Sequence, residues 1–89
     1  MATFILIRHK VQDYKTWKAA FDAHALKRTE AGLTERYLLR SLDDPNEVVA
    51  LFEATDLDRA RAFSESADLR QKMQEGGVVD KPDVYFLNS

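Results

Sequence analysis

The sequence predicts an α+β domain of the ferredoxin-like type, with the element order βαββαβ, an antiparallel sheet and two helices on one face. Three observations support this prediction: β-rich runs and helical patterns alternate in this order, a hairpin signal joins the two middle strands, and 89 residues suffice for one domain, residues 1–89. Right-handed crossovers would then make the first and third strands the central ones.

The first strand and the first helix are marked by composition and by capping residues. Residues 3–11 are rich in β-branched and large apolar side chains, which is typical of a strand. Asp13 is placed to cap a helix over residues 14–31, and Gly32 provides its C-terminal end.

The second half of the chain contains two further strands, a second helix and a last strand. Residues 33–42 and 47–54 are β-rich runs, and the Asp-Asp-Pro-Asn sequence between them has the chemistry of a hairpin turn. Asp56 caps a second helix, whose apolar stripe changes register near Ser66, so we expect a break there. Residues 84–87 form a last short strand.

The register of the hairpin stays open at this point. If Leu42 opposes Val48, Arg40 lies on the sheet face that carries Ala50; if Asp43 opposes Val48, Tyr37 lies there instead.

Both faces of the predicted sheet are apolar. Residues 4–7 and 48–52 are apolar at every position and belong to the two central strands, although the helices can cover only one face. A second copy of the same sheet is the simplest cover for the other face, so we expect a homodimer through the sheet face. Arg8 and Glu53 are expected to pair on that face.

Composition excludes several classes of function. The 13 basic and 15 acidic residues are interspersed, which argues against a nucleic-acid-binding surface. The lack of cysteine excludes disulfides and thiolate metal sites and fits the cytoplasm. The apolar run at residues 4–7 is too short for a signal peptide or a membrane span. No motif marks a phosphate loop, a metal site or a bound cofactor, and we expect none of these.

The polar residues of the first helix are the strongest candidates for chemistry. His24 and Arg28 fall within the stripe led by Trp17, so both point toward the sheet. A buried arginine without a partner costs several kcal/mol. The helix therefore either opens on a pocket lined by both residues, or His24 binds a backbone carbonyl while Arg28 extends to water.

Further residues are candidates for binding a substrate. His9 ends the first strand on the face of Ile7, and Tyr37 and Arg40 lie on opposite faces of the second strand. The aromatic side chains Trp17, Phe21, Phe52 and Phe63 come from the two helices and the third strand. They form either the wall of a substrate slot or part of the hydrophobic core.

The chain as a whole resembles the dimeric α/β-barrel superfamily, and within it the antibiotic biosynthesis monooxygenase-like (ABM-like) proteins. The residues that carry the resemblance run through nearly the whole chain: residues 8–11 with Tyr14, Trp17 and Phe21, residues 44–49, residues 57–63 and residues 77–87. The resemblance implies a dimer with a cavity between sheet and helices in each subunit. The superfamily includes cofactor-independent quinone-forming monooxygenases, haem-degrading enzymes, lactone isomerases and chlorite dismutases.

The resemblance also bears on individual residues. Quinone-forming members have an asparagine and a tryptophan where this chain has Ala50 and Ala54, which counts against that particular chemistry. The haem-degrading pattern is not matched either. A histidine in the second half of the first helix lines the cavity in other branches, and His24 is similar in position.

The resulting hypothesis is a homodimer whose cavity binds a small aromatic or carbonyl metabolite. It would act as a monooxygenase or an isomerase- or cyclase-like enzyme without a cofactor, with His24 as proton acceptor and Arg28 or Arg40 holding an anionic oxygen. The alternative is a non-catalytic dimer with a ligand-binding or structural role.

Overall fold

The computed structural model describes residues 2–89. The elements occur in the order β1 (Thr3–Lys10), α1 (Tyr14–Ala23), α2 (Ala25–Glu30), β2 (Leu33–Arg40), β3 (Glu47–Ala54), α3 (Leu57–Ser64), α4 (Ala67–Glu75) and β4 (Asp83–Asn88). The predicted order is confirmed, and each predicted helix consists of two shorter ones.

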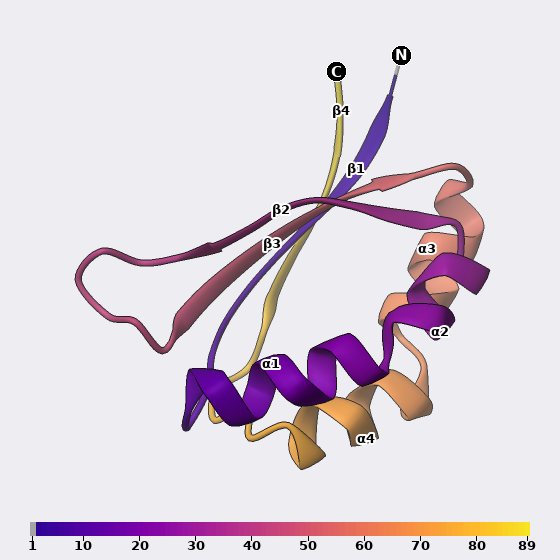
Figure 1. The fold of residues 1–89 in the computed structure, drawn as a ribbon. Helices are drawn as coiled ribbons and strands as arrows, with labels where there is room; N and C mark the ends of the chain where they lie inside the picture. Colours follow the sequence, from indigo (N-terminus) through magenta and orange to yellow (C-terminus); the bar gives the residue numbers. More distant parts are fainter. Residues whose placement is uncertain (1) are drawn as a thin grey trace.

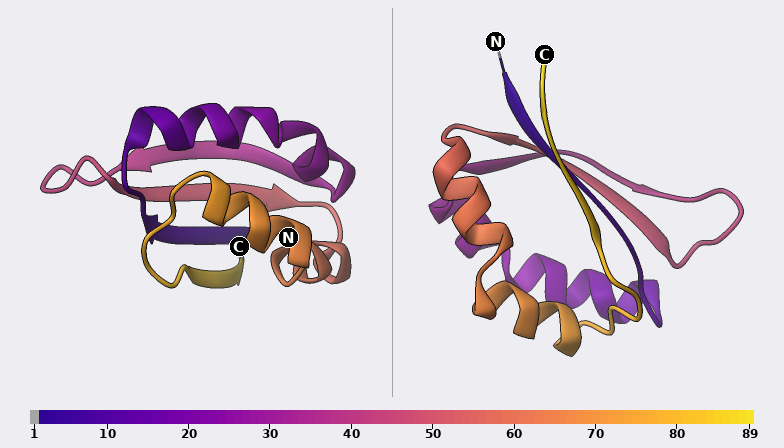
Figure 2. Two further views of the ribbon diagram at one scale, coloured as in Figure 1. Left: turned by 90° about the horizontal axis from the view of Figure 1, so that it is seen from below. Right: turned by 180° about the vertical axis from the view of Figure 1, so that it is seen from behind.

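The sheet has the strand order β2-β3-β1-β4 with antiparallel neighbours, so β1 and β3 are central as predicted. All the helices lie on one side of it, and the β2–β3 hairpin extends beyond them (Figures 1 and 2). This arrangement is the ferredoxin-like fold expected from the sequence. It leaves the other side of the sheet, which we call the open face, without cover from any element of residues 2–89 (Figure 2).

The helix ends follow the predicted capping residues. The Asp13 carboxylate accepts a hydrogen bond from the backbone N–H of Thr16 at 3.0 Å, and Ser66 caps α4 through the N–H of Leu69 at 3.1 Å. Gly32 has a φ of +80°, the left-handed conformation that ends a helix at low cost in glycine. The predicted break near Ser66 is therefore confirmed.

The first helix also breaks, at His24, which the sequence did not predict. The backbone N–H of His24 bonds to the carbonyls of both Ala20 and Phe21 at 3.2 Å, so the last turn of α1 is tightened. The Phe21 carbonyl also accepts a hydrogen bond from the Arg28 side chain at 2.7 Å. Arg28 thus satisfies a carbonyl that the break exposes, and α2 continues in a new direction (Figure 1).

In the observed hairpin register Arg40 opposes Val48, whereas the two predicted alternatives placed Leu42 or Asp43 there. Arg40 therefore lies on the helix-covered face with Val48 and Ala50. A bulge between Glu35 and Tyr37 shifts the strand by one residue, and Tyr37 opposes Leu51 on the open face.

The core lies between the helices and the sheet. Ile5, Ile7, Val48 and Phe52 point into it from the two central strands and are buried. Trp17 packs against Val48 from α1, and Phe21 joins this cluster to the one that contains Phe52. None of the helices among residues 2–89 has both the length and the apolar character needed to cross a membrane.

Ion pairs lie toward the ends of the open face. The expected pair between Arg8 and Glu53 does not form, because the two residues lie far apart along their strands. Arg8 instead pairs with Glu47, Asp80 and Asp83 at 2.8–3.1 Å.

Candidate functional site

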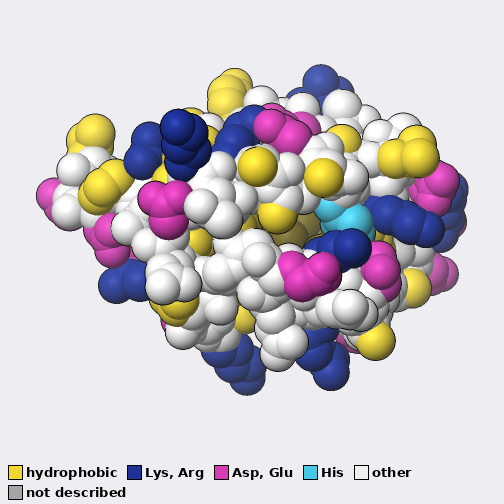
Figure 3. All heavy atoms as spheres, turned by 60° about the horizontal axis from the view of Figure 1, so that its bottom comes forward, with side chains coloured by type: hydrophobic (Ala, Val, Ile, Leu, Met, Phe, Trp, Pro, Cys, Tyr) yellow, Lys and Arg dark blue, Asp and Glu magenta, His cyan; other side chains and the backbone are white. Residues whose placement is uncertain are grey.

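A cavity of about 60 Å³ lies between the helix-covered face of the sheet and the helices. It opens to the surface at a hollow bordered by histidine, basic and acidic side chains (Figure 3). Since a water molecule needs roughly 10–15 Å³ by this measure, the cavity holds only a few non-hydrogen atoms without rearrangement. Its apolar wall comes from both central strands and from three helices and consists of Ile7, Trp17, Ala20, Phe21, Ala50, Phe52, Phe63, Leu69 and Met73.

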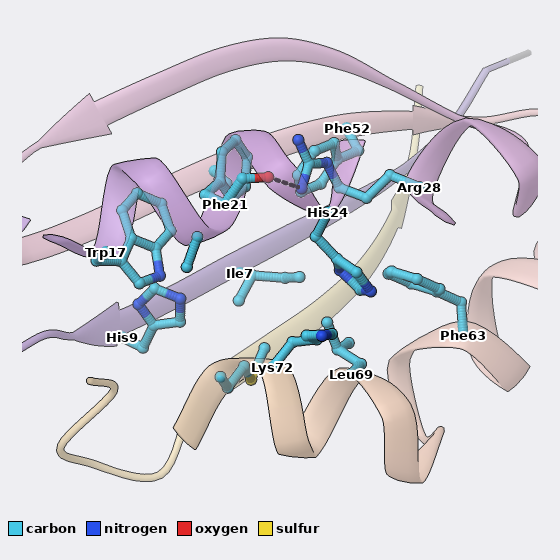
Figure 4. A pocket seen from close by; sticks show the side chains of 13 residues that line it. Ile7, His9, Trp17, Phe21, His24, Arg28, Phe52, Phe63, Leu69 and Lys72 are labelled. Atoms are coloured by element: carbon cyan, nitrogen blue, oxygen red, sulfur yellow. Dashed lines mark hydrogen bonds between the residues drawn. The ribbon is translucent and has the colours of Figure 1, made fainter. Parts of the chain in front are cut away.

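Four polar side chains complete the lining: His9, His24, Arg28 and Lys72. His9 lies beside Trp17 at one end, His24 and Arg28 lie at the other, and Lys72 reaches in from α4 (Figure 4). An apolar cavity with a few converging polar groups is the usual form of a small-molecule site.

Arg28 is buried, with 8% of its surface exposed. Its guanidinium carbon lies 3.7 Å from the centre of the Phe21 ring, and Nη1 donates to the Phe21 carbonyl. Among residues 2–89 no carboxylate lies within ion-pair distance of it. Burial lowers the pKa of Arg28, and the more distant Glu35 and Asp22 offset part of that effect. Arginine nevertheless stays protonated in proteins, so the cavity contains a positive charge without a counter-ion.

His24 is 7% exposed, and its Nε2 lies 3.1 Å from Oδ2 of Asp68 on α4. In the neutral imidazole, donation from Nε2–H to Asp68 leaves Nδ1 with the lone pair of a proton acceptor. The ring stacks on Phe63 at 5.8 Å between centroids, which fixes its plane. The carboxylate thus orients the histidine in the way that catalytic bases require.

His9 is the most deeply buried polar residue at the site, with 5% exposed. Its ring meets Trp17 edge to face at 5.3 Å, and within residues 2–89 its buried Nδ1 has no hydrogen-bond partner. Burial lowers the pKa of His9 below 6.5; the backbone of His9 itself and then the charge of Asp80 oppose this effect, and Arg8 adds to it. His9 is therefore neutral at pH 7.

The low pKa of His9 predicts a loss of stability in mild acid. Below its ordinary pKa of 6.5 the unfolded chain binds a proton that the folded chain does not, so the free energy of unfolding decreases as the pH falls. Urea unfolding between about pH 7.5 and pH 5.5, above the range in which carboxylates titrate, should show this decrease. His9→Gln removes the titrating group and should abolish most of the decrease; equal losses in both proteins would contradict the prediction.

The aromatic residues predicted for binding are brought together. Trp17 and Phe21 stack with their ring centroids 4.8 Å apart, and Phe21 lies 6.2 Å from Phe52. All three line the cavity and also belong to the core, so the two interpretations offered by the sequence describe the same residues.

Tyr37 and Arg40 do not line the cavity, and this corrects the expectation that they border it. Tyr37 is 61% exposed on the open face, because the hairpin register pairs it with Leu51. Arg40 lies on the correct face but outside the cavity, with its guanidinium 3.8 Å from the Tyr14 ring and bonded to the Pro45 carbonyl.

Asp68 and Lys72 belong to the candidate site but are not among the site residues predicted from the sequence. Both lie on α4, the helix predicted to begin after Ser66, and Lys72 is one turn beyond Asp68. Lys72 also lies three residues after Leu69, which is the signal that could have placed it near the buried stripe.

No group of three or more histidine or acidic side chains among residues 2–89 is arranged to hold a metal ion.

Comparison with known proteins relates this fold to solved structures. No protein-family model matches the chain, and no curated protein matches it. Among solved structures, a protein from Bordetella bronchiseptica assigned to the antibiotic biosynthesis monooxygenases is 18% identical, with a TM-score of 0.77 over 100% of this chain and 98% of that one. SnoaB, a cofactor-independent oxygenase from Streptomyces nogalater, is 16% identical, with a TM-score of 0.72 over 99% of this chain and 94% of that one.

A third similar structure comes from Caulobacter crescentus and carries the same family assignment as the Bordetella protein; it is 16% identical, with a TM-score of 0.76 over 99% of this chain and 89% of that one. The resemblance to the ABM-like proteins is thereby confirmed at the level of the fold. Identities this low leave the function to be argued from the site.

Proposed function

We propose that this protein binds a small organic metabolite in the cavity and removes a proton from it without a cofactor. The observation that carries the proposal is the pairing, in one apolar cavity, of an oriented histidine with a buried arginine that lacks a counter-ion. A base beside a fixed positive charge is what the deprotonation of carbon next to a carbonyl group needs.

The proposed chemical step is the same for an isomerase and for an oxygenase. Nδ1 of His24 takes the proton, the electron pair of the C–H bond forms a C=C bond, and the carbonyl oxygen becomes an anionic enolate oxygen near Arg28. In an isomerase, His24 returns the proton to another carbon. In an oxygenase, the enolate carbon adds dioxygen, and the peroxide takes the proton back from His24 to give a hydroperoxide. Loss of the second hydrogen from that carbon, with cleavage of the O–O bond, then releases water and leaves a new carbonyl group.

The similar structures support the oxygenase form of this proposal. SnoaB has the same fold and is described as a cofactor-independent oxygenase. In this chain Asp68 holds the histidine, Arg28 supplies the positive charge, and the stacked Trp17 and Phe21 keep water from one side of the cavity.

We also propose that the protein is a homodimer through the open face. The centre of that face carries Leu6 and Leu51, and its edges expose Leu39, Tyr85 and Leu87. A contiguous apolar surface with ion pairs at its margins has the anatomy of a protein interface.

A thermal-shift screen tests the proposal with phenols, quinones, lactones and small keto acids. A ligand at 100 times its dissociation constant stabilises the native state by about 2.7 kcal/mol. We expect a carbonyl compound to stabilise the wild type, to stabilise His24→Ala less, and to be consumed by the wild type. A ligand that binds but is never consumed would instead identify a carrier or sensor, and the lack of any hit would contradict the proposal.

A further inference from the structure

We propose that the ligand is a small, flat carboxylate with a hydroxyl or carbonyl oxygen at its opposite end. Its carboxylate would lie at Arg28 and its second oxygen at His9. This inference rests on the proposed function and adds the class of ligand.

The first argument is the charge of the cavity. Arg28 and Lys72 bring positive charge to the lining, and His9 and His24 are its other polar members. On α4, Asp68 is bonded to His24, and Glu75 lies 3.9 Å from Nζ of the half-exposed Lys72, so Arg28 is the cation of the lining that has no ion pair among residues 2–89. Glu35 and Asp22 act on Arg28 only at a distance, and both are exposed. The lining therefore contains no acidic side chain that would attract a cationic ligand or repel an anionic one.

The second argument is the state of Arg28 in the free protein. One nitrogen, Nη1, donates to the Phe21 carbonyl, and among residues 2–89 the others have no described hydrogen-bond partner. A guanidinium has five N–H donors in one plane, and stacking on the Phe21 ring leaves the edge of that plane available. A carboxylate can accept two parallel N–H bonds from such an edge, and the remaining N–H groups of the guanidinium are left for the enolate oxygen of the proposed step. The group that suits the free site is therefore an anion that is charged on arrival.

The third argument concerns the opposite end. His9 and Arg28 lie at opposite ends of the cavity, with Ile7 between them (Figure 4). Nδ1 of His9 is buried and has no partner among the described residues, which is a costly state that a ligand hydroxyl or carbonyl would relieve. The aromatic wall between the two ends favours a flat body, and a cavity of about 60 Å³ admits at most one ring or a short chain, with rearrangement of the lining side chains.

Three probes separate these contributions: 4-hydroxybenzoate, its neutral analogue 4-hydroxybenzamide, and benzoate, which lacks the hydroxyl group. Isothermal titration calorimetry of the wild type at pH 7.5 should show that 4-hydroxybenzoate binds at least about tenfold more tightly than the amide. Benzoate should bind more weakly than 4-hydroxybenzoate, and His9→Phe should remove that difference.

Substitutions test whether Arg28 is the positive charge that selects the acid over the amide. Arg28→Gln should remove the preference for the acid over the amide, and Arg28→Lys should restore part of it. Lys27→Gln removes a neighbouring exposed charge on α2 and should leave the preference intact. Circular dichroism checks folding, and the acid-to-amide ratio of the wild type tests the charge argument even if Arg28→Gln does not fold.

Two outcomes would overturn this inference. If the acid and the amide bind equally well to the wild type, the charge on Arg28 does not select the ligand. If neither binds while a neutral carbonyl compound from the thermal-shift screen does, the ligand class is wrong although the proposed function stands. Failure of the proposed function has a different signature, in which no compound of either charge stabilises the wild type.

Discussion

Replacing Leu51 with Asp is expected to convert the proposed homodimer into a folded monomer. Leu51 lies on the open face in β3, opposite Leu6 on β1 and Tyr37 on β2. In the dimer an aspartate there would lose its hydration without a partner, which costs a few kcal/mol and weakens association about a hundredfold or more. In the monomer the carboxylate is solvated, so the fold survives.

Size-exclusion chromatography with light scattering measures the mass, and circular dichroism checks the fold. Leu26→Asp is the matched control, because Leu26 is 69% exposed on α2, away from the open face, and should leave the dimer unchanged. A wild type that runs as a monomer, or a Leu51→Asp protein that remains dimeric, would contradict the proposed interface. An unfolded Leu51→Asp protein would contradict the expectation that the monomer folds on its own.

The fold could be predicted because its signals are local. Asp13 and Ser66 form the caps that their sequence neighbours suggest, and Gly32 adopts the left-handed backbone expected at a helix end. The break at His24 had no such signal, since no glycine or proline stands near it. It depends on a contact of the folded state, in which the Arg28 side chain bonds to the Phe21 carbonyl.

The candidate site could be predicted only in part, for the same reason. Helical spacing placed His24 and Arg28 with Trp17, and all three line the cavity. The partner of His24 is Asp68, which is 44 residues away, and only the packing of α4 beside the break in the first helix brings them together. The faces of Tyr37 and Arg40 stayed open because a register change of one residue reverses the face of every side chain in a strand, and the turn sequence does not fix the register.

His24→Gln is expected to lower turnover by about a hundredfold to ten-thousandfold while ligand binding is retained. Glutamine keeps the polar character of the side chain but has no nitrogen that can accept a proton, so only the proton-transfer step is lost. The substrate is the carbonyl compound found in the thermal-shift screen. Incorporation of deuterium from D₂O at its acidic carbon measures proton transfer separately from any later reaction with dioxygen.

Asp68→Asn tests whether the carboxylate acts through His24. Loss of the charge weakens the bond to Nε2 and allows the ring to turn, so we expect a smaller loss of exchange and an altered pH profile, as for a positioning residue. Asp58→Asn makes the same change in the first turn of α3 and should leave exchange unaffected. If His24→Gln exchanges deuterium as fast as the wild type, His24 is not the proton acceptor. A loss in Asp68→Asn as large as in His24→Gln would mean that the base works only when Asp68 holds its ring.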